Sequence, residues 1–154
     1  MPRILLLMLA LGFAVPVLCQ PSPLPERGDG GTRWTIGRCV NRFTAARVES
    51  TKVGYQYWFA DKAFLDGRTL KLSVVRPGGA THPPHAHVED ELFFVLEGTA
   101  EFFLDGDSAE VGPMTSLYCP PDSRHGIRNI GKGELKYLVI KKYPFVSQPE
   151  QQKP

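Results

Sequence analysis

Several features that would point to other classes of protein are missing from this sequence. It has no block of Lys and Arg and no basic stripe spaced by aromatic residues, and its formal net charge is only +2. Nothing therefore predicts a nucleic-acid partner. It also has no apolar run of the roughly 20 residues that span a bilayer. No Ser/His/Asp order, phosphate-binding loop or Cys-x-x-Cys pair is present, so those chemistries are not indicated.

Short apolar segments separated by turn residues make up most of the chain. Fifteen Gly, fourteen Pro and nine Phe occur in 154 residues, and no long stretch shows helical spacing. This composition is typical of short strands joined by turns, and the length suits one domain with one core. We therefore expect an all-β protein with little helix.

The N-terminus has the layout of a secretory signal peptide. A basic residue precedes the run Ile4–Leu18, and a Pro-rich polar stretch follows it. We expect residues 1–19 to be removed after Cys19, so that the mature protein begins at Gln20 and is secreted or periplasmic, with no membrane contact. A membrane anchor is the first alternative, but the run is short and contains Pro16. A lipoprotein modified at Cys19 is the second, but bulky Leu18 stands where a small residue is usual.

The rest of the chain divides into a linker, one domain and a tail. Residues 20–32 (QPSPLPERGDGGT) hold three Pro and three Gly, and we expect a flexible linker there. The single domain is expected over 33–145, with its core motifs in 70–142, and a disordered tail over 146–154. Strands are predicted at 53–60, 69–76, 91–97, 100–105, 108–111, 115–119, 126–129 and 134–141.

One predicted strand carries information about its surroundings. Residues 92–96 (LFFVL) are apolar on both faces of the strand, so we expect both faces to be covered. The cover would come from the N-terminal strands or from a second subunit, which makes a homodimer the expected assembly.

Removal of the leader leaves two cysteines, Cys39 and Cys119. In an oxidising compartment they could form one disulfide. A pair of buried free thiols is the simpler interpretation, and we favour it.

All four histidines lie in two places, His82, His85 and His87 in one segment and His125 in another. Neutral imidazole is a common ligand for transition metals, and carboxylate adds a charged oxygen donor. His85 and His87 are two residues apart, so in extended chain their rings point to the same side. Glu91 lies four residues further on and has the same parity. A barrel interior would allow His125 to join them.

At this point the residues resemble those of the cupin superfamily. Gly79 is followed after five residues by His85-Ala86-His87, after three more by Glu91, and after six more by Gly98, as in the first cupin motif. The segment 120–125 (PPDSRH) resembles the second motif, Pro-x-Gly-x-x-His, with a trailing Asn at 129. Two turn glycines of the second motif are replaced, by Asp122 and by Met114. Asp tolerates the left-handed backbone better than most residues, so its turn should survive.

The resemblance covers about half of the chain, and it implies a jelly-roll barrel, also called a double-stranded β-helix. It also implies that inward His85, His87, Glu91 and His125 bind one divalent ion of iron, manganese, zinc, copper or nickel. From the residues alone we expect a site of three nitrogens and one oxygen, which leaves coordination positions open for catalysis.

Other side chains are weaker candidates. His82 is either a loop residue or a ligand or proton carrier, and Glu91 is a possible base. Arg124 and Arg128 could hold a substrate carboxylate, although exposed arginines at a barrel rim are more common. Tyr57 could line a substrate pocket, although a core position is the more common role of such a residue.

The resemblance to quercetin-dioxygenase-like cupins favours an enzyme that brings a small oxygen-rich substrate to a metal and to dioxygen. The same ligands also serve isomerases and lyases that act on sugars or sugar acids, and the fold does not choose among these reactions. A non-catalytic module that binds a small ligand or metal is a further alternative. A storage or interaction protein that uses the barrel only as a scaffold is the last, and the intact ligand set argues against it.

Overall fold

The computed structural model describes residues 35–63 and 67–144. The expected signal peptide over 1–19, the linker over 20–32 and the tail over 146–154 lie outside the described residues and stay predictions. Within the described part, no helix is long and apolar enough to cross a membrane.

Almost all of the regular secondary structure among the described residues is strand, so the all-β prediction is confirmed. A short helix α1 (Ile36–Cys39) and a 3-10 turn (Ala45–Arg47) precede them. All eight predicted strands are present, each with ends within one residue of the predicted ones, and β1 is additional. The strands are β1 (Glu49–Thr51), β2 (Gly54–Ala60), β3 (Arg68–Val75), β4 (Glu91–Glu97), β5 (Ala100–Leu104), β6 (Asp107–Val111), β7 (Ser116–Cys119), β8 (His125–Asn129) and β9 (Leu135–Lys142).

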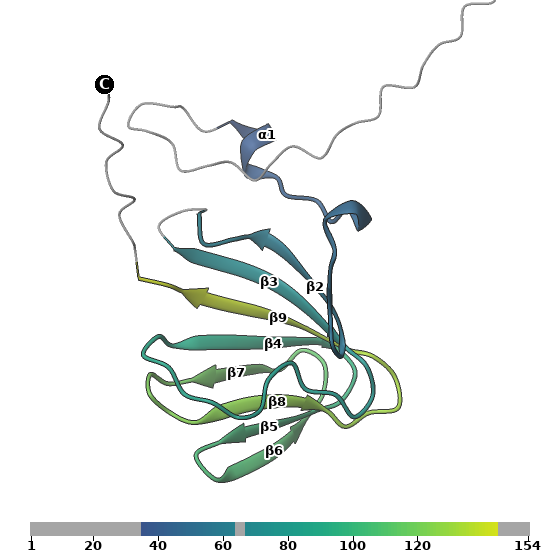
Figure 1. The fold of residues 1–154 in the computed structure, drawn as a ribbon, viewed down its shortest axis with the longest axis vertical. Helices are drawn as coiled ribbons and strands as arrows, with labels where there is room; N and C mark the ends of the chain where they lie inside the picture. Colours follow the sequence, from purple (N-terminus) through teal and green to yellow (C-terminus); the bar gives the residue numbers. More distant parts are fainter. Residues whose placement is uncertain (1–34, 64–66, 145–154) are drawn as a thin grey trace, which may run out of the picture.

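The strands form two antiparallel sheets that face each other across one core (Figure 1). The larger sheet has the order β1-β2-β3-β9-β4-β7, and the smaller has the order β6-β5-β8. Every second residue of β4 and β9 points between the sheets, where apolar side chains from both sheets pack together. The core cluster contains Val75, Phe93, Val95, Ala100, Phe102, Leu117, Cys119, Ile127, Leu135, Tyr137 and Val139.

Left-handed backbone occurs where the turns require it. Gly98 connects β4 to β5 with φ +89°, and a Cβ there would lie 2.6 Å from the Glu134 carbonyl oxygen, so no other residue fits without a shift. Asp122 and Met114 have φ values of 60° and 62°. The two residues that replace the turn glycines therefore keep the left-handed conformation of the turn.

Among the described residues, the two-sided apolar strand β4 is covered on one face only. Phe93 and Val95 are buried in the core, but Leu92 and Leu96 on the outside are each 38% exposed. The N-terminal strands do not cover β4, so that part of the prediction is wrong: β1 and β2 instead extend the sheet sideways beyond β3. In register with Leu92 stand Tyr118 of β7 and Ile140 of β9, both exposed. We call Leu92, Leu96, Tyr118 and Ile140 the outer apolar face.

The segment before β1 covers a different part of the outer surface. Tyr57 of β2 is fully buried; its hydroxyl donates to the Arg42 carbonyl at 2.8 Å, and its ring lies 4.8 Å from that of Phe43. In β2 the neighbouring Trp58 pairs with Lys71, which faces the interior of the barrel. Because alternate residues of a strand point to opposite faces, Tyr57 lies on the outside of the sheet.

Asn129 at the end of β8 joins three parts of the fold. It is fully buried, and its side-chain nitrogen donates to the carbonyls of Val75 and Gly133, each at 2.8 Å. Its side-chain oxygen accepts from the Gly131 amide at 2.9 Å. One amide side chain thus satisfies the buried Val75 carbonyl of β3 and two part-buried backbone groups of the turn between β8 and β9.

The substitution Asn129→Asp should therefore destabilise the fold strongly. It keeps the shape of the side chain but removes both donors and buries a carboxylate opposite two carbonyl oxygens. We expect the free energy of unfolding to fall by about 3 kcal/mol or more, measured by urea denaturation. The matched control Asn41→Asp, at a half-buried position outside the strands, should stay within about 0.5 kcal/mol. Equal stability of the two variants would contradict the role of Asn129.

Candidate metal centre

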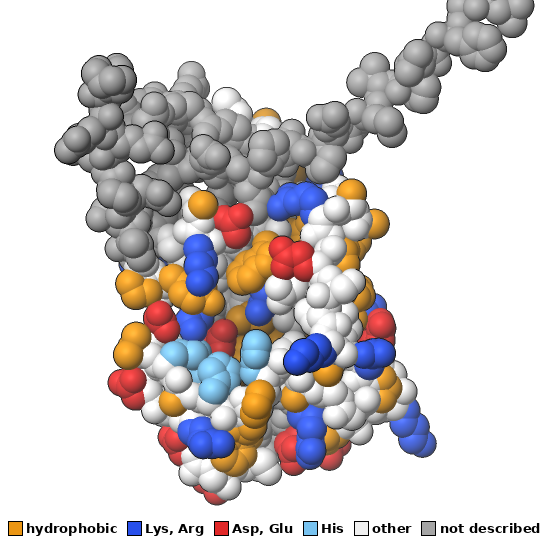
Figure 2. All heavy atoms as spheres, in the orientation of Figure 1, with side chains coloured by type: hydrophobic (Ala, Val, Ile, Leu, Met, Phe, Trp, Pro, Cys, Tyr) orange, Lys and Arg blue, Asp and Glu red, His pale blue; other side chains and the backbone are white. Residues whose placement is uncertain are grey.

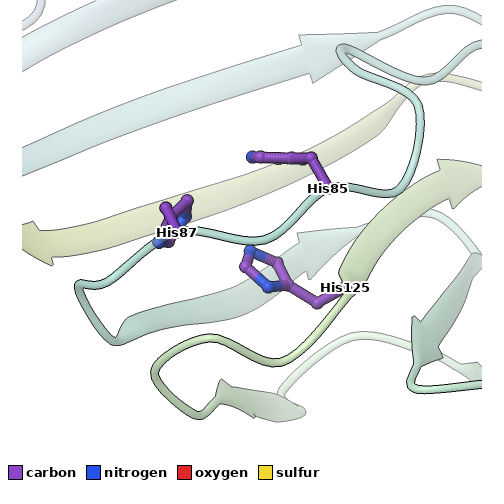
Figure 3. A group of neighbouring side chains, drawn as sticks. All are labelled: His85, His87 and His125. Carbon is purple, nitrogen blue, oxygen red and sulfur yellow. The ribbon is translucent and has the colours of Figure 1, made fainter.

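The loop that carries the first three histidines is held against β8. The backbones of His85 and His125 exchange two hydrogen bonds, each 2.9 Å long, and the Asp122 amide donates to the His87 carbonyl at 2.8 Å. Ala80 forms a further bridge with Arg128. The loop therefore runs as an irregular partner of β8, although Pro83 and Pro84 lie within it. This pairing places residues about 40 positions apart in the sequence side by side (Figure 3).

The four predicted ligands come together at this place. The ring nitrogens of His85, His87 and His125 lie within 4.8 Å of one another, and the three rings come from two different segments. Glu91, the first residue of β4, has its Oε2 atom 3.3 Å from His125 Nε2 and 3.7 Å from His87 Nε2. We call these four residues the candidate metal centre. It lies beside a hollow on one face of the molecule, where histidine, acidic and basic side chains gather (Figure 2).

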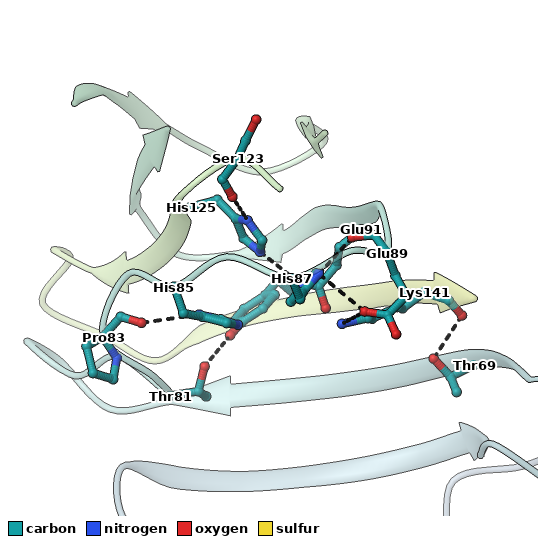
Figure 4. A network of polar contacts seen from close by, with 11 residues as sticks. Thr69, Thr81, Pro83, His85, His87, Glu89, Glu91, Ser123, His125 and Lys141 are labelled. Carbon is teal, nitrogen blue, oxygen red and sulfur yellow. Dashed lines mark hydrogen bonds and ion pairs between the residues drawn. The ribbon is translucent and has the colours of Figure 1, made fainter. Parts of the chain in front are cut away.

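Each of the three rings is oriented by a backbone carbonyl. His85 Nδ1 lies 3.2 Å from the Pro83 oxygen, His87 Nδ1 lies 2.7 Å from the Glu89 oxygen, and His125 Nδ1 lies 2.8 Å from the Ser123 oxygen (Figure 4). A carbonyl can only accept a hydrogen bond, so Nδ1 must carry the proton in each ring. In the neutral ring the lone pair is then on Nε2, which is the arrangement of metal-binding histidines.

The Nε2 atoms point to positions where a cation fits. His125 Nε2 and Glu91 Oε2, 3.3 Å apart, would both be acceptors when the ring is neutral and the carboxylate ionised. Buried His87 Nε2 has no hydrogen-bond partner among the described residues. A metal ion between these atoms satisfies all of them, because each would donate a lone pair to it. The residues present therefore fit a divalent metal.

His85 is the most exposed ligand of the centre. Burial lowers its pKa, the hydrogen bond to the Pro83 carbonyl raises it, and the neighbouring imidazoles lower it further. The net shift favours the neutral ring, whose lone pair a metal requires.

Of the weaker candidates, Glu91 and His82 lie at the site, and the other three lie elsewhere. The His82 ring lies 5.5 Å from that of His85 and borders the same cavity. Arg128 is exposed on the small sheet and pairs with Glu101 at 2.7 Å, and Arg124 is exposed beside Asp105. Tyr57 lies on the outside of the large sheet. The structure therefore does not bring Arg124, Arg128 or Tyr57 to the centre.

The cavity beside the centre has a volume of about 100 Å³ and contains several residues that the sequence did not single out. We call it the metal cavity. Lys141 is only 8% exposed and pairs with Glu89 at 3.4 Å, and the Tyr137 hydroxyl lies 3.2 Å from the Thr81 hydroxyl. Phe93, Ile127 and Val139 give one part of the wall apolar side chains. The lining residues are Lys71, Thr81, His82, His85, His87, Glu91, Phe93, Gly126, Ile127, Tyr137, Val139, Lys141 and Tyr143.

The two cysteines lie in different environments and are free thiols in the structure. Cys119 of β7 is fully buried, and its sulfur lies within 4.8 Å of ligand atoms of Glu91 and His125. Burial, helped by the Glu91 charge, raises the pKa of the Cys119 thiol to about 12, so it stays protonated at neutral pH. Cys39 is exposed and borders a groove with Ile140 on the outside of the large sheet. The two thiols are therefore on opposite faces of this sheet.

Comparison with known proteins identifies the part of the chain that carries the centre. Residues 71–141 match the cupin domain family. An uncharacterized protein of Methanocaldococcus jannaschii is 31% identical over 78 residues, which is 51% of this chain and 62% of the relative. The polyketide synthase CurC of Streptomyces cyaneus is 31% identical over 80 residues, which is 52% of this chain and 51% of that protein. The chain thus spans little more than half the length of these relatives.

Solved structures share the fold at low sequence identity. A cupin 2 conserved barrel domain protein from Salinispora arenicola superposes with a TM-score of 0.56 at 20% identity, covering 68% of this chain and 87% of that one. The polyketide cyclase RemF from Streptomyces resistomycificus superposes with a TM-score of 0.56 at 24% identity, covering 71% and 88%. These likenesses support the barrel architecture and carry no information on the reaction.

Metal analysis of the purified protein should find about one transition-metal ion per chain. His125→Ala removes the ligand that β8 supplies, and we expect metal affinity to fall more than about 100-fold. Loss of a group that only hydrogen-bonds to a metal ligand already costs about 10- to 100-fold in affinity. His85→Ala and His87→Ala should behave alike. Glu91→Gln keeps an oxygen donor but loses the charge, so some metal should remain. His82→Ala is the control and should keep full occupancy. Equal occupancy in the parent and in His125→Ala would show that the centre is wrongly assigned.

Proposed function

Since this chain belongs to the cupin superfamily, we propose that it is a secreted enzyme whose candidate metal centre holds one divalent transition metal ion. The substrate is a small oxygen-rich molecule, and the favoured reaction is a dioxygenase-like oxidation. The observation that carries this proposal is the convergence of the Nε2 atoms of His87 and His125 on Glu91. The His87 nitrogen lies 3.7 Å from the carboxylate and has no hydrogen bond among the described residues, and the His125 nitrogen lies 3.3 Å from the same carboxylate.

The ligand set supports a catalytic role over a closed structural site. Three imidazoles and one carboxylate leave positions free in an octahedral field, and the metal cavity opens beside them. A metal bound there would act as a Lewis acid on a substrate oxygen and could bring it together with dioxygen.

The residues of the chain itself have separate tasks in this proposal. Phe93, Ile127 and Val139 give the metal cavity apolar walls that limit the entry of water. The hydroxyls of Tyr137 and Thr81 lie within reach of each other and provide donors and acceptors for substrate oxygens. His82 at the exposed edge is placed to exchange protons with solvent.

One curated relative supports an oxygen-rich substrate. It is named a polyketide synthase, and polyketides are carbon chains rich in carbonyl and hydroxyl groups. Because the chain covers 51% of that polyketide synthase, the activity of the whole relative is not transferred.

A screen with oxygen consumption recorded tests this function. When the protein is expressed with its own leader in a secretory host, we expect the measured mass of the mature protein to match a chain that begins at Gln20. After loading with Fe²⁺, Mn²⁺, Zn²⁺, Cu²⁺ or Ni²⁺, it is offered flavonols, polyphenols, 1,3-diketones and sugar acids. We expect oxygen uptake in step with loss of one of these substrates, and its loss in His125→Ala. Turnover without oxygen uptake would contradict the dioxygenase reaction and leave an isomerase or lyase, and a retained leader would contradict secretion.

The outer apolar face supports a homodimer. Three of its residues, Leu92, Tyr118 and Ile140, form one row across β7, β4 and β9, and each is at least 38% exposed in the single chain. We expect a dimer at micromolar concentration by light scattering, and a monomer for Leu92→Glu, because a buried charge opposes association. Ile130→Glu, at a residue that is 41% exposed after β8 of the small sheet, should leave the dimer intact. A monomeric parent protein would contradict this assembly.

A further inference from the structure

Lys71 of β3 is a charged residue on the inside of the barrel that the proposed metal chemistry does not use. It pairs across the sheet with Val139, a core residue, and lines the metal cavity together with His85, His87 and Glu91. Its ammonium group lies 5.1 Å from the centre of the Trp58 ring. The side chain therefore extends over the inner surface of the sheet and not into open solvent.

Lys141, the second lysine of the metal cavity, already has a carboxylate partner, whereas Lys71 has none among the described residues. Lys141 is paired with Glu89 at 3.4 Å. In the described part of the chain, no carboxylate forms an ion pair with Lys71. The carboxylates of Glu91 and Glu49 act on it from a distance, as does the positive charge of Lys141. Burial lowers the pKa of Lys71, Glu91 and Glu49 raise it, and Lys141 lowers it.

The charges in the cavity do not balance once the centre is loaded. Glu91 is then a ligand, and its single negative charge is set against a divalent cation. Lys141 and Glu89 cancel each other, so the excess charge of the metal and the ammonium of Lys71 remain. A half-buried ammonium without a counterion is costly, and an anionic ligand removes that cost.

On this basis we propose that the substrate of the metal cavity carries a carboxylate or an equivalent anionic oxygen, and that Lys71 binds it. This inference rests on the proposed function, because it assigns the substrate class of the same site. The ammonium offers three donors, and a hydrogen bond from it to an anionic oxygen is among the stronger ones in proteins. A volume of about 100 Å³ suits a small molecule or one end of a larger one. Lys71 is thus a specificity-determining residue.

The test compares two probes of nearly equal size that differ in charge, lactate and lactamide. Both have the same hydroxyl group, but only lactate is an anion. The full mature protein is loaded with Co²⁺, whose content is measured and whose visible absorption reports ligand entry, and each dissociation constant is obtained by titration. Lys71→Met keeps the length of the apolar stem and removes the charge. We expect it to weaken lactate binding at least about tenfold and lactamide binding less than about twofold.

Two further variants separate the charge from other effects. Lys71→Arg should keep most of the affinity for lactate, because it keeps a cationic donor at the same place. Lys136→Met removes a lysine that pairs with Glu97 at 2.8 Å and follows the buried core residue Leu135, so that its own side chain lies on the outside of β9. It should change neither constant.

The outcomes distinguish this proposal from the one on which it rests. A protein that takes up no Co²⁺ contradicts the metal centre, and the role of Lys71 falls with it. Full Co²⁺ loading with lactate affinity unchanged in Lys71→Met, or with both probes weakened equally, overturns the assignment of Lys71 alone. Full loading of the parent protein without measurable lactate binding overturns it as well.

Discussion

The candidate metal centre depends on one backbone interaction, the pair of hydrogen bonds between His85 and His125. Two 2.9 Å bonds fix the loop before β4 against β8, so that ligands from both segments face one point. The loop contains two adjacent prolines, which lack the amide donors of a regular strand. A full ladder of backbone hydrogen bonds is therefore impossible there. The bridge between His85 and His125 and the bond from Asp122 to His87 hold the loop in place instead. Asn129 holds the far end of β8 in the same way, through side-chain bonds to backbone groups of β3 and of the following turn.

The hydrogen bonds of the imidazole rings to the backbone determine where the lone pairs of the rings point. All three Nδ1 atoms face carbonyls within two residues of their own position, so the local chain path determines which nitrogen is protonated. The Nε2 atoms are then left to face Glu91 and one another. A site in which lone-pair acceptors face one another is unfavourable without a cation, because the acceptors repel. A bound cation makes it favourable, and this is the electrostatic condition for binding a metal.

Much of this could be predicted from the sequence, because it depends on local patterns. Turn residues separate the strands, and spacing within one segment places His85, His87 and Glu91 on one side of the chain. Alternation in a strand, however, shows which residues share a face and not which face is inside. Thr69, Lys71 and Ser73 are polar and alternate with apolar neighbours, the usual pattern of a solvent-exposed face. In the fold they are the inner face, because the barrel interior near the metal cavity is polar. The same ambiguity affects Leu92, which lies on the outer face of the sheet and is 38% exposed.

The interior of the barrel is therefore divided along its length, and this division explains why some of the weaker candidate residues lie away from the centre. Towards Leu135 the inward residues are apolar and form the core, whereas towards Lys141 they are charged and surround the centre. A residue contributes to the site only if it is inward-facing and near that second end. Arg128 belongs to β8, as His125 does, but it stands three residues further on and faces outward, where Glu101 pairs with it. Lys71 meets both conditions, although it lies outside both motifs, eight residues before Gly79. Proximity to a motif is thus a weaker guide to the substrate site than strand register, which only the folded sheet supplies.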